Sequence, residues 1–174
     1  GALRVGLRET GLVLGRQPAD VEFAGFEGPR GFRRAVVVLY LSTTIPLEES
    51  VYVPARYFDM IERIYDVTSL PRVVHSDTGR PPTDLPMVSQ FATELLAATK
   101  HAQIRVVDFG QDFVEALQRL ILRFEGERFE VITVHLPLSN SLTGYFGSGL
   151  EELGLSFNAV FPEQDAGDEL VLGV

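Results

Sequence analysis

The chain carries apolar patterns typical of strands and apolar stripes typical of helices. Near the N-terminus two strands are predicted, over 9–15 and 33–41, joined by a loop that contains Gly and Pro. The second strand holds the run Ala-Val-Val-Val-Leu-Tyr-Leu, in which apolar residues do not alternate with polar ones. Such a run predicts a strand that is buried on both faces of a sheet.

A loop over 42–50 leads to a helix that is predicted to begin at Pro54, because proline suits the first helical position. Apolar residues then recur at helical spacing on one stripe, at Tyr57, Phe58, Ile61, Ile64 and Tyr65. Residues 71–86 contain four prolines and one glycine, and this composition predicts a long loop or linker.

A hairpin is predicted next, with strands over 88–98 and 103–109 and a turn at Lys100-His101. A helix is the alternative for the first of these strands, because apolar residues lie four apart at Met87, Phe91 and Leu95. The hairpin is the favoured interpretation.

The rest of the chain predicts an alternation of helix and strand. Asp112 with Glu115 three residues later has the pattern of a capping box, and Ser141 and Gly154 are suited to begin and end a second helix. These elements are predicted over 112–126, 129–138, 141–154, 155–161 and 169–174. From Pro54 the order is α-β-β-α-β-α-β-β, which indicates an α+β domain.

Composition excludes several classes of protein. The 174 residues are 45% hydrophobic and 22% charged, as in a folded domain, and the lack of Cys excludes thiol catalysis and disulfides. A net charge of −9 argues against a nucleic-acid partner. His75, His101 and His135 lack the spacing of metal ligands, so no metal is expected. The absence of long apolar stretches and of a signal-peptide pattern predicts a cytoplasmic protein without a membrane partner.

Charge changes sign near residue 42. Residues 1–41 carry six arginines and four acidic residues, a net charge of +2, whereas the rest carries nine cations and twenty acidic residues, a net charge of −11. Such a step can mark a partner surface or the junction of two modules, and the junction is the favoured interpretation.

Several segments resemble a known family. The element order from Pro54 is similar to the later part of the GNAT acyltransferase fold, a mixed and mainly antiparallel sheet flanked by helices. The segment GLRETGLVLG resembles the Gly-aromatic-x-x-x-Gly strand that closes many GNAT domains, with Leu7 in place of the usual Phe. Together with FRRAVVVLYL, VYVPARYFDMIERIYDVTSLPR and LEELGLSFNAVFPEQDAGDELVLGV, it resembles a bacterial family in which a GNAT-like region accompanies an anti-sigma-factor-type kinase domain.

The resemblance implies a fold and a division of the chain. Residues 1–41 would be the last strands of a preceding GNAT-like domain, and 42–174 would form a second, degenerate GNAT-like domain. In the family, the fourth and fifth strands splay apart to admit acyl-CoA.

The resemblance also implies where a coenzyme would bind. The family holds the CoA pyrophosphate on backbone N–H groups, in a small-residue turn between the fourth strand and the next helix. The matching stretch here, VVDFGQDF, has one glycine, Gly110, and places Asp108 and Asp112 where a polyphosphate would lie. Carboxylates there would repel the ligand, so Gly110 as a turn and Asp112 as a helix cap are the favoured roles.

The family's catalytic acid has no counterpart at its expected place. That acid is a Tyr four residues before the Gly that ends the penultimate helix, and here the position is Leu150, which carries no proton. Tyr145 on the same helix and His135 in the preceding strand are the remaining catalytic candidates. An active enzyme would use acetyl-CoA or another acyl-CoA, with Gly110, Gln111, Ser139 and Asn140 as the coenzyme-binding candidates.

These observations favour a non-catalytic GNAT-like module that senses a small ligand or binds a protein partner within a bacterial regulatory protein. One alternative is an acyl-CoA-dependent N-acyltransferase. Another is a dimerisation domain, because a free sheet edge near Arg33 and Arg34 would allow a second copy to pair.

Overall fold

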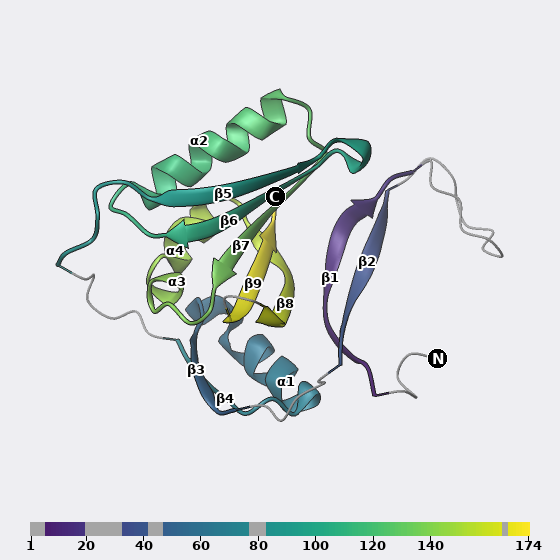
Figure 1. Ribbon diagram of the computed structural model, residues 1–174, viewed down its shortest axis with the longest axis vertical. Coiled ribbons are helices and arrows are strands. Elements are labelled where there is room, and N and C mark those ends of the chain that lie inside the picture. The colour runs from purple at the N-terminus through teal and green to yellow at the C-terminus, as the bar shows by residue number, and fades with distance from the viewer. Residues whose placement is uncertain (1–5, 20–32, 42–46, 77–82, 165–166) are drawn as a thin grey trace.

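The computed structural model describes residues 6–19, 33–41, 47–76, 83–164 and 167–174. Its main element is a seven-stranded sheet in the order β2-β1-β8-β9-β7-β6-β5 (Figure 1). Those strands are β1 (Arg8–Gln17), β2 (Arg34–Tyr40), β5 (Gln90–Leu96), β6 (His101–Asp108), β7 (Val131–Pro137), β8 (Ser156–Gln164) and β9 (Gly167–Gly173). The helices are α1 (Phe58–Thr68), α2 (Phe113–Gly126), α3 (Leu142–Tyr145) and α4 (Gly147–Glu152), with 3-10 turns over Ala55–Tyr57 and Ala97–Thr99.

The sheet is mixed and mostly antiparallel. β6 and β7 run parallel, and the other strand pairs described in this sheet are antiparallel. Pairing between β6 and β7 ends at Arg105 and His135, although β6 continues to Asp108 and β7 to Pro137. The two strands therefore stop pairing before they end, on the side from which the chain enters α2 and α3.

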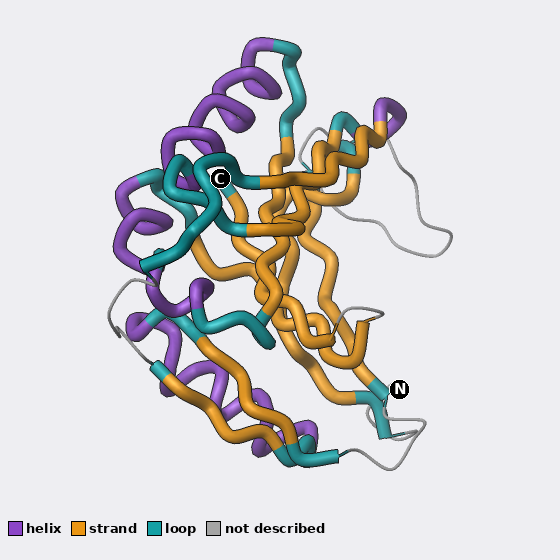
Figure 2. Tube along the Cα trace, turned by 60° about the vertical axis from the view of Figure 1, so that its left-hand side comes forward, coloured by secondary structure: helices purple, strands orange, loops and turns teal. Residues whose placement is uncertain are grey.

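The helices gather on one side of the sheet, and their apolar stripes form the core with one face of it (Figure 2). Side chains alternate along a strand, so every second residue of β6, β7 and β9 points into this core. The strands contribute Ala102, Ile104, Val106, Ile132, Val134, Leu136, Leu170 and Leu172, and α2 contributes Phe113, Leu117, Ile121 and Phe124. No helix in the described part of the chain is long and apolar enough to cross a membrane.

The β1–β2 hairpin joins the sheet through β8 at one registered pair, Gly11 with Ala159. A Cβ on Gly11 would lie 2.3 Å from the Ala159 Cα, so only glycine permits this approach. Arg33 ties the other end of the hairpin to the sheet: Nε donates to the Gly15 carbonyl, Nη2 to the Thr99 carbonyl, and Nη1 pairs with Glu130 at 2.7 Å.

The predicted division of the chain into two domains near residue 42 stays a prediction.

Strand β2 differs from its prediction as a strand buried on both faces. Its residues alternate between half-buried and exposed, with Val37 48% and Leu39 40% exposed. One face of β2 is half-buried against the rest of the protein, whereas the face that carries Val37 and Leu39 is left exposed. An apolar run indicates a strand but does not show which faces another layer covers.

Two short strands overlap the segments 42–50 and 71–86 that were predicted as loops. β3 (Glu49–Tyr52) and β4 (Arg72–His75) pair in parallel as a separate two-stranded sheet beside α1 (Figure 1). The loop prediction was wrong there because each strand has four residues and is stabilised by a partner distant in sequence, a signal that local composition does not carry. Of the predicted linker, residues 77–82 lie outside the described part, as do residues 165 and 166 of the last turn.

Most other elements confirm the sequence prediction. The hairpin β5–β6 forms, so the helical alternative for its first strand is wrong, and Lys100 closes its turn with a φ of 48°. Three residues of the apolar stripe predicted for the first helix are buried: Tyr57, Ile61 and Tyr65. The helix predicted over 141–154 is divided at Phe146 into α3 and α4.

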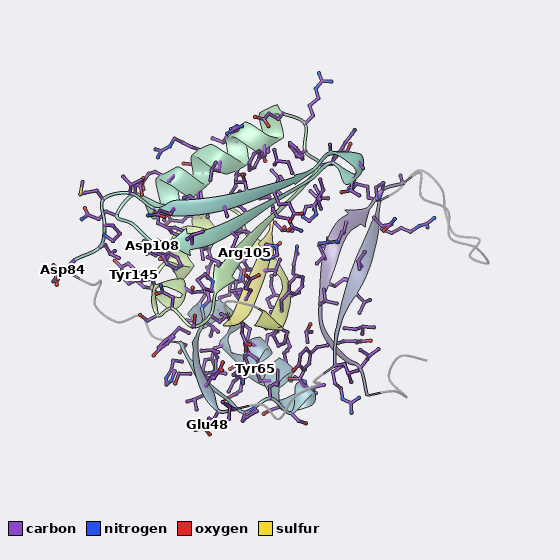
Figure 3. The ribbon with its side chains drawn as sticks, viewed as in Figure 1. Glu48, Tyr65, Asp84, Arg105, Asp108 and Tyr145 are labelled. Carbon is purple, nitrogen blue, oxygen red and sulfur yellow. The ribbon has the colours of Figure 1, made fainter. Side chains whose placement is uncertain are left out.

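A buried ion pair joins the small sheet to the large one. The guanidinium of Arg72 on β4 forms two hydrogen bonds with Asp168 on β9, at 2.8 and 3.2 Å, and the two side chains are 2% and 1% exposed. Tyr65 of α1 donates to the same carboxylate at 2.8 Å, and burial beside Asp168 raises the pKa of Tyr65. The pair, together with Tyr65 (labelled in Figure 3), therefore fixes β4, α1 and β9 relative to one another.

We expect Asp168→Ala to lower the free energy of unfolding by about 3–5 kcal/mol, because it leaves the Arg72 charge buried without its partner. Glu49→Ala is the matched control: Glu49 lies 3.6 Å from the same guanidinium but is 53% exposed, so we expect a loss below about 1 kcal/mol. Urea denaturation followed by circular dichroism measures both. Equal losses in the two variants would contradict this role of the buried pair.

Candidate functional site

The turn between β6 and α2 is where the family resemblance would place a coenzyme phosphate, and the chain's own backbone lies against it. The Gly110 N–H donates to the Ser89 hydroxyl at 2.8 Å, and the Gln111 N–H donates to the Pro86 carbonyl at 2.8 Å. The Gln111 side chain donates to the Leu85 carbonyl. Segment 85–89 therefore supplies the hydrogen-bond acceptors for the N–H groups of Gly110 and Gln111.

Glycine is required at position 110 by this close packing. A Cβ there would lie 2.5 Å from both the Ser89 nitrogen and the Val88 carbonyl carbon. The turn was predicted from Gly110, and the structure adds the physical reason, which is the approach of segment 85–89.

Asp112 acts differently from the predicted helix cap. Its side chain makes no capping hydrogen bond to α2 and accepts the Ser89 N–H at 2.7 Å instead. This hydrogen bond from the backbone holds the pKa of the Asp112 carboxyl below its usual range. A negative charge therefore stays beside the turn at neutral pH. Capping was predicted because Asp and Glu have the right spacing, but a donor from a distant segment competes successfully for the carboxylate.

Three phenylalanines fill the space around this turn. The rings of Phe109 and Phe113 lie 4.7 Å apart, and Phe146 lies 5.7 Å from the first and 4.7 Å from the second. Tyr145, a catalytic candidate, packs its ring 5.0 Å from Phe146 at the end of α3 (Figure 3). Its position is that of an aromatic at the edge of this cluster.

The other two coenzyme candidates follow β7. The Asn140 side chain accepts the Leu142 N–H at 3.0 Å, so Asn140 caps α3 in place of the predicted Ser141, which makes no capping bond. Ser139 is exposed in the same turn. The four candidates are thus held in two pairs, Gly110 and Gln111 by segment 85–89, and Ser139 and Asn140 at the start of α3.

His135 belongs to a row of polar side chains on the sheet face opposite the helices. Its Nδ1 lies 3.0 Å from Glu169 Oε2, and its Nε2 lies 3.3 Å from the Thr133 hydroxyl. The hydroxyl lies 2.8 Å from His101 Nε2, and Arg105 Nε pairs with the other oxygen of Glu169 at 2.9 Å. The row crosses β6, β7 and β9, and its two histidines and Glu169 are at most 5% exposed.

The hydrogen bonds of the row run in one direction when both imidazoles are neutral. A carboxylate only accepts, so Nδ1 of His135 carries the hydrogen and Nε2 accepts from the Thr133 hydroxyl. The same hydroxyl then accepts from Nε2 of His101. His101 Nδ1 is left as a buried acceptor without a hydrogen-bond partner in the described part of the protein.

Burial lowers the pKa of His101 to about 4, and the nearby charges of Arg16 and Arg33 and the imidazole of His135 act in the same direction. His101 is therefore neutral at physiological pH. The sequence predicted His135 as a candidate but not its partners in the row. The signal was present, because residues two apart on adjacent strands share a face, but it required the strand register.

A small hollow of about 90 Å³ lies at the outer end of the row. Arg105, labelled in Figure 3, is 54% exposed there. It is lined by Ala92, Thr93, Glu94, Gln103, Arg105 and His135. Two larger hollows, of about 230 and 270 Å³, lie beside the β1–β2 hairpin. Within the described ranges, no group of three His, Asp or Glu side chains is arranged to hold a metal ion.

Comparison of the chain with protein-family models, with curated proteins and with solved structures gave no match. The turn at Gly110 and the polar row are therefore two places whose geometry bears on function.

We expect His101 to make folding stability pH-dependent. Between about pH 6.5 and pH 4 the unfolded chain binds a proton at His101 and the folded protein does not, so the free energy of unfolding falls by roughly 3 kcal/mol as the pH is lowered through this window. Urea unfolding at neutral pH and at about pH 4 measures this change.

His101→Gln should lose this part of the pH dependence, whereas the control His75→Gln, at an exposed hydrogen bond to Ser50, should keep it. If wild type and His101→Gln lose equal stability on acidification, the effect does not come from His101.

Proposed function

We propose that this chain is a GNAT-like domain that does not use acyl-CoA, and that it serves as a ligand-sensing or protein-interaction module of a bacterial regulatory protein. The segment from β5 to β9 supports the likeness. It runs strand, strand, helix, strand, two short helices, strand, strand, with the spatial order β5-β6-β7-β9-β8 and one parallel pair, β6 with β7. The resemblance implies two central strands that separate, and the early end of pairing at Arg105 and His135 agrees with that expectation.

The observation that carries the proposal is the hydrogen bonding of the turn before α2. A phosphate cradle needs backbone N–H groups directed at the ligand. Here those of Gly110 and Gln111 donate to Ser89 and Pro86, and the Asp112 carboxylate is beside them. A pyrophosphate would have to break both hydrogen bonds, displace segment 85–89 and approach a negative charge.

We expect acetyl-CoA to produce no saturable heat in calorimetry and no saturable shift of the Gly110 and Gln111 amide signals in ¹H–¹⁵N spectra, even at millimolar ligand. Asp112→Asn removes the charge but keeps both amide hydrogen bonds of the turn, so we expect it to remain silent as well.

Saturable micromolar binding with shifts at both amides would contradict the proposal and favour the acyltransferase alternative. Binding by Asp112→Asn alone would show that charge, rather than the occupied amides, keeps the coenzyme out.

A second candidate function is self-association through β2, and the exposed apolar residues of the hairpin favour it. Leu12, Leu14, Val37 and Leu39 are 40–56% exposed, and β2 ends the sheet as described. Antiparallel pairing of β2 with a second copy about Val37 places apolar residues opposite apolar residues and Arg34 opposite Tyr40. No like charges meet in that register, so the strand is complementary to itself.

We expect the wild-type sedimentation coefficient to rise with protein concentration toward that of a dimer, and Val37→Lys to remain monomeric, because lysine on an edge strand opposes strand pairing. The matched control is Val73→Lys on β4, where valine is 43% exposed and lies outside the hairpin. It should dimerise as wild type does. A wild-type chain that stays monomeric at high concentration would refute the dimer.

A further inference from the structure

We propose that the hollow of about 230 Å³ beside β1 binds a small uncharged ligand that presents an amide-type edge, an N–H donor next to a carbonyl acceptor, to the side chain of Asn158. The inference deepens the ligand-sensing role proposed above and rests on it for its purpose. Its geometry is separate from the coenzyme turn. The hollow lies where β7 begins, whereas the turn at Gly110 follows the end of the parallel strand β6.

Asn158 is an extra residue in β8. The pairing of β8 with β9 shifts between Phe157 and Ala159, so Asn158 lies in a β-bulge. Bulges re-aim a side chain and recur beside functional sites. The Asn158 side chain lies against Gly173 of β9, where a Cβ on the glycine would be 2.5 Å from the amide Nδ2. Glycine at position 173 therefore leaves the room that the amide occupies.

The Asn158 amide is buried and lacks a protein partner. The residue is 4% exposed, yet its side chain makes no hydrogen bond within the described part of the chain. A buried amide normally has hydrogen-bond partners, because burial without them costs free energy. Asn158 lines the hollow, and neither of its amide atoms is sealed inside the protein. A molecule that enters the hollow can therefore supply the missing partners.

The lining of the hollow favours an uncharged ligand. As described, it holds one charged side chain, Glu130, among mainly apolar residues. Hydrogen bonds from Lys100 and Arg33, which line the neighbouring hollow, hold the pKa of the Glu130 carboxyl below its usual range. A negative charge therefore stays at the rim and opposes an anionic ligand. An amide-type edge gives Asn158 one hydrogen bond in each direction, since its side chain both donates and accepts.

A ligand in this hollow also contacts the hairpin. Leu14 and Gly15 of β1 form part of the lining, and Gly173 of β9 forms another part. The hairpin itself has one registered pair with β8, at Gly11. A ligand that touches both β1 and β9 binds only while the hairpin is docked, so its binding stabilises the docked hairpin.

Titration of the full chain with two primary amides, acetamide and nicotinamide, tests the site in ¹H–¹⁵N spectra. Acetate and nicotinate are the anionic counterparts of the same shapes. We expect at least one amide to shift the Asn158 side-chain and Gly173 backbone signals saturably, and its carboxylate counterpart to bind at least tenfold more weakly. Amide protection factors of β1 and β2 should rise about tenfold when that amide is tenfold above its dissociation constant. No saturable shift with either amide, or equal binding of amide and carboxylate, would overturn the proposal.

Asn158→Leu keeps the approximate size of the side chain and removes both hydrogen-bonding groups. We expect it to weaken amide binding at least tenfold and to melt at the wild-type temperature or above, because the described chain loses no hydrogen bond. Gln118→Leu is the matched control: it removes an exposed amide from α2, and it should bind as wild type does.

Unchanged binding in Asn158→Leu would overturn the site. A melting temperature well below that of wild type would do the same, since the amide would then have a structural role. Acetyl-CoA binding at the Gly110 turn would refute the proposed function, whereas silence toward acetyl-CoA and toward both amides would refute this site alone.

Discussion

The rest of the structure depends on where the N–H groups of the turn before α2 direct their hydrogen bonds. Buried backbone donors must find acceptors, and here segment 85–89 supplies them through Pro86 and Ser89. This contact seats α2 and brings the phenylalanines around Phe109 together. While these hydrogen bonds are made, the same N–H groups cannot donate to a phosphate.

A second constraint comes from the two unlike faces of the sheet. The helices bury one face with apolar side chains, whereas the other face is covered in part by a hairpin that touches β8 at Gly11 and is held by Arg33. Polar side chains between these layers are shielded from water, so they must form hydrogen bonds with one another. The row from His101 to Glu169 is the result, and it gives the hairpin side of the sheet a chemistry that the helical side lacks.

Of the candidate site, the sequence predicted single residues but not their partners. Gly110 was recognised as a turn and His135 as a strand histidine, and both are found so. Glu169, which pairs with His135, lies 34 residues from it in the chain. Ser89, whose N–H donates to the Asp112 carboxylate, lies 23 residues from Asp112. Such pairs depend on strand register and loop packing. A single sequence does not show which distant residue a side chain will meet in preference to a nearer one.

The sequence by itself determined the elements whose stability is local or strongly periodic: α1 and α2 through their apolar stripes, β7 through its β-branched residues, and the β5–β6 hairpin through its turn. Only the tertiary structure decided which side of β2 is covered, that residues 49–52 and 72–75 are strands, and that Asn140 rather than Ser141 caps α3. The physical reason is that helical periodicity and turn chemistry act over a few residues. Strand pairing, burial and the allocation of hydrogen-bond acceptors are settled by segments that meet only after the chain has folded.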